Sequence, residues 1–208
     1  MNWMDMTQRE FLAALASSSP TPGGGTAAAI SLGQAAALSI MVCDLTLGKD
    51  KWTDGWAVAE EVQRCAIPLM SRSGDLAQHD SDAFDGVMSA YSMKKDSEDE
   101  RLTRQSAIRT ATVKAAEVPL DTARAASTLL AMLPDLASYG NGNAVSDVGV
   151  AGLLASASAK GALFNVEINL NGLPEHLSSP YWPEVQSLQE KIRIDARKVM
   201  DAVRARLG

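Results

Sequence analysis

Hydrophobic positions along the chain recur at the three- and four-residue spacing of buried helix faces, and no stretch alternates convincingly as a strand does. The pattern indicates a succession of helices joined by loops. We therefore expect an all-α fold, an antiparallel multi-helix bundle that forms a single domain over residues 1–208. Helices are predicted over about 7–17, 26–47, 56–92, 97–133, 146–169 and 182–207.

Local signals mark several of the helix ends. Thr7 stands three residues before Glu10, and Ser97 stands three residues before Glu100, so each pair predicts a capping box at a helix start. Gly48 is placed to cap the C-terminus of the second helix. That helix is almost entirely apolar, which predicts a position at the centre of the bundle.

Prolines interrupt two of these patterns. Pro68 should kink the third helix or split it into two helices. The fourth helix is expected to continue past Pro119, whereas Pro134 and Gly140 should bracket a short, separate turn of helix.

Composition supports helices and narrows the range of partners. Hydrophobic residues make up 46% of the chain and aromatic residues only 5%, which suits closely packed helices better than a β-sandwich. The net charge of −6 argues against a non-specific nucleic-acid binder. Residues 26–43 are apolar enough to suggest a membrane span. Polar Ser31, Gln34 and Ser39 interrupt them, however, so we expect a core helix and no membrane contact.

Cysteine and histidine are too sparse for a typical metal site. There is no CxxC motif, and the only histidines, His79 and His176, stand far apart, so no metal is expected. Cys43 and Cys65 lie in apolar helical patterns and are expected to be buried free thiols, as in a reducing compartment. The first residues lack the basic flank and apolar core of a signal peptide, so a cytoplasmic protein is expected.

Residues 20–26, Pro-Thr-Pro-Gly-Gly-Gly-Thr, run directly into the second predicted helix. Glycines at a helix start leave backbone amides uncovered near the positive end of the helix dipole, where an anionic or strongly polar ligand can bind. The alternative is structural, because glycines followed by alanines also let two helices approach closely. By itself the motif favours packing.

A second segment rich in amides and hydroxyls covers residues 140–147 and leads into the helix predicted over 146–169. Ser146 and Asp147 stand where an N-cap and a first-turn acid are favourable. Asn165 and Asn169, four residues apart, share one face of that helix. Buried asparagines need hydrogen bonds, so the pair predicts either a structural network or a polar ligand cavity, and both interpretations remain open.

The third segment is an acidic stretch around Asp80. Asp80 lies four residues before Phe84 and on the stripe that Tyr91 continues, so it is the carboxylate expected to face inward. At a cavity it could act as a general acid or base. Asp82 and Asp85 are more simply explained as solvated surface acids.

These segments together resemble the cyclodeaminase/cyclohydrolase family, which acts on one-carbon derivatives of tetrahydrofolate. It includes the cyclodeaminase half of formiminotransferase-cyclodeaminase and free-standing bacterial methenyltetrahydrofolate cyclohydrolases. Three departures are visible: Lys94 replaces a common proline before Lys95, Gly142 adds flexibility to its loop, and Asp44 stands where asparagine is usual. The resemblance covers nearly the whole chain and is strongest at residues 20–26, 44–49, 80–90, 140–151 and 165–170.

The resemblance implies roles for individual residues. Asp80 is assigned to proton transfer, and Asp147 to pairing with the substrate's amidinium charge or to a pterin N–H contact. Lys95 is the candidate for protonating a leaving nitrogen or binding a folate carboxylate. Substrate contacts are expected from Pro22, Gly23, Gly24, Gly25, Asn143, Ser146, Asn165 and Asn169.

The resemblance also implies a reaction, and cyclohydrolase is favoured over formiminotetrahydrofolate cyclodeaminase because no formiminotransferase module accompanies the domain. A non-catalytic folate-binding helical module is the further alternative. No cofactor beyond the tetrahydrofolate substrate is expected. A homodimer with sites near the subunit interface is implied, and apolar Val185, Leu188 and Ile192 of the last helix are expected to be exposed and available for it.

Overall fold

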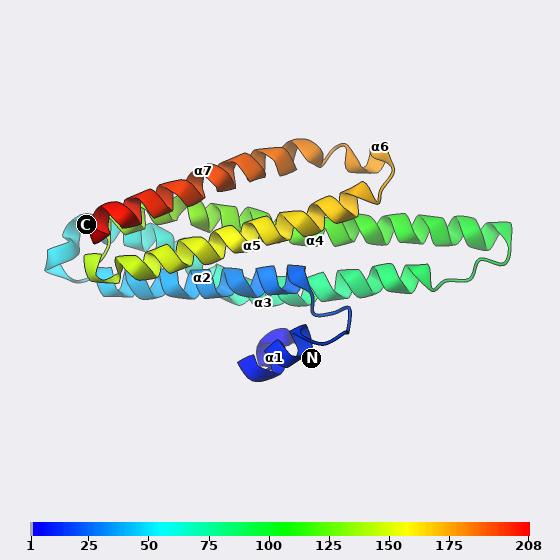
Figure 1. The fold of residues 1–208 in the computed structure, drawn as a ribbon, viewed down its shortest axis with the longest axis horizontal. Coiled ribbons are helices and arrows are strands. Elements are labelled where there is room, and N and C mark those ends of the chain that lie inside the picture. Colours follow the sequence, from blue (N-terminus) through cyan, green and yellow to red (C-terminus); the bar gives the residue numbers. More distant parts are fainter. Residues whose placement is uncertain (1) are drawn as a thin grey trace.

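The computed structural model describes residues 2–208, and this part of the chain contains helices and no strand (Figure 1). The all-α prediction is therefore confirmed. Three short 3₁₀ turns, η1 (Trp3–Asp5), η2 (Asp50–Gly55) and η3 (Gly142–Ala144), lie between or before the helices. The helices are α1 (Gln8–Leu15), α2 (Gly24–Thr46), α3 (Trp56–Tyr91), α4 (Glu98–Tyr139), α5 (Val145–Asn171), α6 (Glu175–Ser178) and α7 (Trp182–Leu207).

Helices α2, α3, α4 and α5 form a ring in which each packs against two neighbours, and α7 lies over the junction of α4 and α5 (Figure 1). The N-terminal segment with α1 lies apart from the ring, close to α2 and α3. Figure 1 also shows that α3, α4 and α5 extend beyond the N-terminal end of α2, so α2 begins within the length of the bundle and not at its edge. Its first turn is thereby surrounded by three longer helices.

Small residues let the central helices pack closely. A Cβ atom added at Gly33 of α2 would lie 2.4 Å from the Oγ of Ser73 in α3. Of the described helices, α2 alone is long and apolar enough to cross a membrane, but half of its most apolar window is buried in the bundle. We therefore assign it to the core, as the sequence predicts; Leu32, Ala36 and Val42 are fully buried there.

Helix starts follow the local signals closely. Thr7 and Ser97 both form the predicted capping boxes, with Glu10 and Glu100 respectively. Gly48 follows the end of α2 with a φ of 68°, a conformation that favours glycine.

Neither Pro68 nor Pro134 splits its helix. α3 runs without interruption through Pro68, and α4 continues through Pro134 to Tyr139, so the separate turn predicted after residue 133 is wrong. Leu133 and Leu136, on either side of Pro134, are each at most 1% exposed. Burial of this continuing apolar face offsets the hydrogen bond that a proline removes.

The two cysteines differ in their surroundings. Cys43 is buried and free, as predicted, and burial raises the pKa of its thiol to about 12. Cys65 is also free but only half-buried, so that prediction was too strong.

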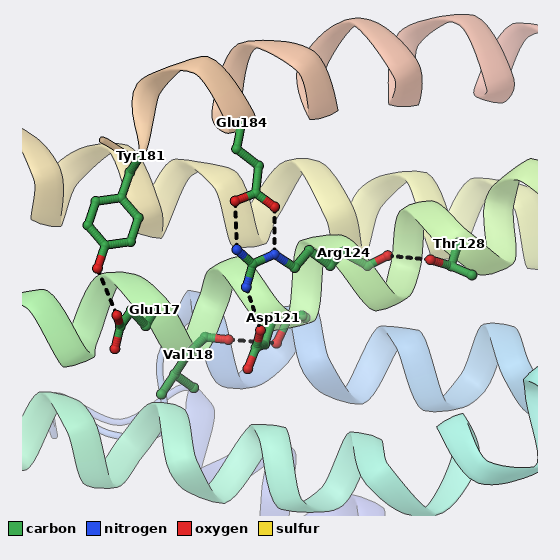
Figure 2. Close-up of polar contacts among 8 residues, drawn as sticks. Glu117, Val118, Asp121, Arg124, Thr128, Tyr181 and Glu184 are labelled. Atoms are coloured by element: carbon green, nitrogen blue, oxygen red, sulfur yellow. Dashed lines mark hydrogen bonds and ion pairs between the residues drawn. The ribbon is translucent and has the colours of Figure 1, made fainter. Parts of the chain in front are cut away.

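α7 is held against α4 by a group of polar contacts (Figure 2). Glu184 accepts two hydrogen bonds from Arg124, both of 2.6 Å, to its two carboxylate oxygens. The Tyr181 hydroxyl donates to Glu117 at 2.7 Å, and Arg124 also donates to Asp121 at 2.8 Å. These contacts fix the start of α7 along the middle of α4.

The apolar face of α7 is directed into the protein. Val185 and Ile192 are 0% exposed, and Leu188 packs against the core. The prediction that these residues are exposed and available for a dimer is therefore wrong. An amphipathic pattern predicts that the apolar face of a helix is buried, but it does not show whether the face packs against the same chain or against another subunit.

Replacing Glu184 with glutamine should lower the free energy of unfolding by about 0.5–1 kcal/mol, because a half-exposed ion pair contributes little. Arg124 holds the pKa of Glu184 below its usual value, so this stabilisation is present above the unfolded-state pKa and is lost as the pH falls through the folded-state pKa. Urea unfolding at pH 7 and pH 3 measures it. The matched control, Glu190→Gln, affects only an exposed pair within α7 and should change nothing measurable; an equal loss in both variants would contradict the prediction.

Candidate active site at the start of α2

Asp80 lies on α3 where that helix packs against the first turn of α2. Its Oδ2 accepts a hydrogen bond of 3.0 Å from the Thr26 hydroxyl, and the Thr26 backbone amide also donates to the carboxylate. A Cβ atom at Gly25 would lie 2.2 Å from Asp80 Oδ1. Glycine at position 25 is therefore what lets the carboxylate reach the backbone of α2.

The position of Asp80 raises its proton affinity. Burial raises the pKa of the carboxyl group, and the two hydrogen bonds from Thr26 partly oppose that shift. Asp80 faces inward as expected, but Phe84 and Tyr91 on the same stripe are 40% and 53% exposed. Its burial thus comes from the close approach of α2 and not from a continuous apolar face.

The glycines of the Pro-Thr-Pro-Gly-Gly-Gly-Thr segment form the N-terminus of α2. Gly23 is the N-cap and makes no side-chain cap, and the first intrahelical bond joins the Ala27 amide to the Gly23 carbonyl at 3.0 Å. The amides of Gly24 and Gly25 precede that bond, where the helix dipole is positive. Gly24 is exposed, whereas Pro22 is buried and Gly25 is buried against Asp80. This end of α2 can therefore bind a polar ligand through its backbone.

One of the two asparagines of α5 belongs to a structural hydrogen-bond network, and the other borders the candidate ligand site. Asn169 Nδ2 donates to the Ala115 carbonyl of α4 and to the Asn165 carbonyl, both at 2.8 Å, so it links two helices. Asn165 Nδ2 donates to the Gly161 carbonyl at 2.8 Å and lies beside the start of α2, 3.9 Å from a Cβ placed on Gly24. Asn169 is thus partly structural, and Asn165 borders the candidate site.

The other predicted site residues lie elsewhere in the chain. Asp147 precedes Asn165 by eighteen residues of one helix, a separation of about 27 Å at 1.5 Å per residue. Lys95 is exposed four residues beyond the end of α3, and the helix from Asp80 to its last residue, Tyr91, already spans about 16 Å. A single chain therefore does not bring Asp80, Lys95 and Asp147 together.

Asn143, Ser146 and Asp147 gather at the opposite end of α2. There Thr46 Oγ1 accepts a hydrogen bond of 2.9 Å from the Asn141 amide, and Asn141 Nδ2 donates to the Leu45 carbonyl at 2.8 Å. The segments 44–49 and 140–147 thus meet, and Asn141 joins them.

Ser146 is not the N-cap that its position suggested. The N-cap of α5 is Ala144, because η3 leads directly into the helix, and Ser146 is exposed in the first turn. Asp147 occupies the first turn as predicted and is half-buried. Asn143 is exposed, and its backbone N–H donates to Asn141 Oδ1 at 3.0 Å.

Sequence reasoning missed three residues around Asp80: its hydrogen-bond partner Thr26, and Ser81 and Trp3 beyond it. Ser81 Oγ lies 3.0 Å from Thr26 Oγ1, and Trp3 Nε1 donates to Ser81 Oγ at 2.9 Å. The adjacency of Ser81 to Asp80 was a usable signal, whereas nothing local in the sequence points to Trp3. Within residues 2–208, no three His, Cys, Asp or Glu side chains are grouped as a metal site requires.

Comparison with known proteins identifies the family. Residues 7–178 match the profile of the formiminotransferase-cyclodeaminase family. The chain belongs to this family. The prediction made from the sequence motifs is thus confirmed, and the motif segments of the family lie at the two ends of α2.

Relatives within the formiminotransferase-cyclodeaminase family carry two different activities in their names. A methenyltetrahydrofolate cyclohydrolase of Methylorubrum extorquens is 40% identical over 169 residues, which is 81% of each chain. The formimidoyltransferase-cyclodeaminase of Rattus norvegicus is 29% identical over 98% of this chain, which spans 38% of that longer protein. The crystal structure of a formiminotetrahydrofolate cyclodeaminase from Thermotoga maritima superposes with a TM-score of 0.87 at 29% identity, covering 99% of both chains.

Proposed function

We propose that the protein hydrolyses 5,10-methenyltetrahydrofolate to 10-formyltetrahydrofolate. The observation that carries the proposal is the half-buried carboxylate of Asp80, which lies at the positive end of α2 with a raised pKa. Burial makes this carboxylate hold a proton more readily than an exposed aspartate does, which suits a general acid or base. The 40% identity to a methenyltetrahydrofolate cyclohydrolase supports this reaction.

Asp80 would serve as base and then as acid in this reaction. Water attacks the cationic methenyl carbon and gives one proton to the Asp80 carboxylate, which leaves a neutral tetrahedral intermediate. The N5–C bond then breaks as N5 gains a proton from Asp80, and the hydroxyl proton leaves to solvent as the formyl C=O forms. The negative charge of Asp80 also favours the cationic substrate before attack.

The remaining contacts to the folate follow from the same geometry. The amides of Gly24 and Gly25, with Asn165, would bind polar edges of the pterin and the one-carbon unit. Asp147 would pair with the amidinium charge or a pterin N–H, and Lys95 with a folate carboxylate or a leaving nitrogen. The reaction adds water to an already electrophilic carbon, so we propose no cofactor beyond the tetrahydrofolate substrate. A cytoplasmic location is part of this proposal.

A homodimer would unite the two ends of α2. An apolar stripe runs along the outer face of α5, where Val150 and Leu153 are 46% and 58% exposed and Phe164 and Ile168 are 69% and 72% exposed. Exposed Lys160 lies between the two pairs, so the stripe consists of two apolar patches on one helix face, and exposed apolar patches are typical of an interface. Because its larger side chains lie on both sides of Ala157, the stripe can pair with a second copy of itself about a two-fold axis.

That axis would cross the helices, so that α5 of each subunit runs antiparallel to α5 of the other. The first turn of the partner's α5, with Ser146 and Asp147, would then lie near the last turns of α5, where Asn165 and Asn169 border the site. The partner's Asn143 would follow on the same side. Each site would thus take Asp80 from one subunit and Asp147 from the other.

Mixed dimers of Asp80→Asn and Asp147→Asn chains test this arrangement. Each variant alone should be nearly inactive, but a heterodimer regains one intact site, so random mixing should restore about 25% of wild-type turnover. The matched control is Asp80→Asn mixed with Gly25→Ala, whose lesions fall in the same half-site and should not complement. Verified heterodimers with no regained turnover would place Asp80 and Asp147 in separate functions.

The identity to cyclodeaminases makes formiminotetrahydrofolate cyclodeaminase the second candidate. The deciding experiment follows the absorbance of 5,10-methenyltetrahydrofolate mixed with the protein and then repeats the measurement with 5-formiminotetrahydrofolate. Loss of the methenyl chromophore above the buffer rate supports the cyclohydrolase. Appearance of the chromophore with ammonia release supports the cyclodeaminase instead, and tight folate binding without either signal would indicate a non-catalytic module.

A further inference from the structure

Four side chains from three parts of the chain form a continuous line of hydrogen bonds that ends at Asp80. Trp3 Nε1 donates to Ser81 Oγ at 2.9 Å, Ser81 Oγ lies 3.0 Å from Thr26 Oγ1, and Thr26 Oγ1 lies 3.0 Å from Asp80 Oδ2. Thr26 and Ser81 are 0% and 2% exposed, so bulk water does not reach their hydroxyl groups. The N-terminal segment is thereby connected to the carboxylate of the candidate site.

The chemistry of these groups fixes the direction of the line. An ionised carboxylate only accepts hydrogen bonds, so the single hydroxyl hydrogen of Thr26 is used on Asp80. The contact between Thr26 and Ser81 then requires Ser81 to donate. An indole N–H only donates, and Trp3 supplies it to the lone pairs of Ser81. All three hydrogen atoms therefore point toward Asp80.

The indole of Trp3 favours the arrangement in which Ser81 donates to Thr26 over the one in which Thr26 donates to Ser81. When Ser81 accepts from Trp3, its own O–H becomes a better donor and a second acceptance becomes less favourable, because linked hydrogen bonds polarise one another. Without the indole, Ser81 can accept from Thr26, and the Thr26 hydrogen then turns away from the carboxylate. The amide of Thr26 would remain as a donor to Asp80.

We propose that Trp3 is a positioning residue for Asp80: its indole N–H orients the hydroxyl groups of Ser81 and Thr26 so that Thr26 donates to the carboxylate. The inference rests on the proposed function, in which Asp80 transfers the protons. Trp3 does not touch the reacting atoms and acts only through Ser81 and Thr26.

The N-terminal segment is attached to the bundle mainly through this bond and through apolar contacts. Met4 fits against Gly74 of α3, where a Cβ would lie 2.7 Å from the Met4 Cγ, and within the segment Trp3 packs edge-on against Phe11 of α1 with ring centroids 6.4 Å apart. Between α1 and α2 lies a cavity of about 590 Å³ lined by Trp3, Phe11 and Ile30 among others. Among the described residues, the Trp3–Ser81 bond is the only hydrogen bond between residues 2–19 and the bundle, so it is the specific polar contact that fixes the segment at the site.

No charged neighbour masks the effect of Trp3 on the pKa of Asp80. Among the described residues, burial and the two Thr26 hydrogen bonds account for the shift in its pKa, and no other charged group contributes. Thr26 and the first turn of α2 face it, with Ser81 and Trp3 beyond Thr26. Asn165 of α5, which is neutral, borders the same turn of α2, while His79 and Asp82 of α3 and Asp5 of the N-terminal segment are exposed.

The test is a Trp3→Phe variant, which keeps an aromatic ring and removes the donor. Carbon-13 NMR of the aspartate carboxyl groups, with the Asp80 signal assigned from Asp80→Asn, follows its titration without any need for catalysis. We expect the midpoint to rise by about 0.3 pH units, since a polarising neighbour changes a charged hydrogen bond by a fraction of its strength. The acid limb of the kcat/KM profile, which reports the free enzyme, should move equally. Phe11→Leu, the matched control, alters packing on Trp3 and should move neither.

Ser81→Ala gives a second measurement that does not depend on the ring. It should shift the Asp80 midpoint upward by less than Trp3→Phe does, because Thr26 loses a polarising donor but gains no competing acceptor. Ser73→Ala removes a buried hydroxyl that bonds only the Met70 carbonyl and should leave the midpoint unchanged. An unchanged midpoint in both Trp3→Phe and Ser81→Ala overturns the proposal. Shifted midpoints in a protein that turns over neither folate would support the hydrogen-bond line and overturn the proposed function instead.

Discussion

Replacing Asp80 with asparagine lowers kcat by about 100-fold or more, because a general acid–base group typically contributes a factor of that size. Asparagine has nearly the same shape, and its carbonyl oxygen can still accept from Thr26, so the fold should be retained. Steady-state turnover of 5,10-methenyltetrahydrofolate measures the loss. The matched control is Asp82→Asn, an exposed carboxylate two residues away, which should keep wild-type kcat. Near-normal turnover of a folded Asp80→Asn protein would remove Asp80 from proton transfer.

The same substitution should make the protein more stable at neutral pH. Burial raises the folded-state pKa of Asp80, so the native state binds more protons than the unfolded state between the unfolded-state and folded-state pKa values. Stability therefore falls as the pH rises through that window, and asparagine removes this loss. We expect the advantage of Asp80→Asn in denaturant unfolding at pH 7 to vanish below the unfolded-state pKa of about 3.9. A variant less stable than wild type at pH 7 would show that the carboxylate mainly stabilises the start of α2.

Replacing Gly25 with alanine should have a comparable effect on turnover without removing any reactive group. The new methyl group would lie 2.2 Å from Asp80 Oδ1, so the carboxylate has to leave its place against α2. A misplacement of about 1 Å at a reacting group can cost about 100-fold in rate, and we expect a loss of that order in kcat.

The matched control for this variant is Gly86→Ala, also on a helix but with nothing within 4 Å of the added methyl group. It should keep full turnover and gain up to about 1 kcal/mol of stability, because alanine is the better helix former. Wild-type kcat in Gly25→Ala would mean that the contact between α2 and Asp80 is not needed for the reaction.

Features set by neighbouring residues were predictable from the sequence. The capping boxes at Thr7 and Ser97 and the left-handed Gly48 depend on groups only a few residues apart, and all three are present. The continuation of α4 through Pro134 was not predictable in this way. It depends on burial of Leu133 and Leu136 by other helices, which no local signal describes.

The site was predictable in its parts but not in its assembly. Asp80 was expected to face inward, although the reason lies in a glycine 55 positions earlier in the chain. The sequence does not reveal the exposed apolar stripe of α5, because that helix is apolar on nearly every side, whereas the amphipathic pattern of α7 wrongly predicts an exposed apolar face there. The hydrogen bond from Trp3 joins residues 78 positions apart, so neither spacing nor composition could indicate it.

α2 is anchored by polar contacts at both ends, and this limits how its length can change. Thr26 bonds Asp80 near its first turn, and Thr46 bonds Asn141 at its last. One inserted residue would turn everything beyond it by about 100° and move it by about 1.5 Å, so one of these two bonds would be lost. Homologous chains should therefore keep the number of residues between these two threonines fixed, while gaining or losing residues freely in the hairpin between α3 and α4.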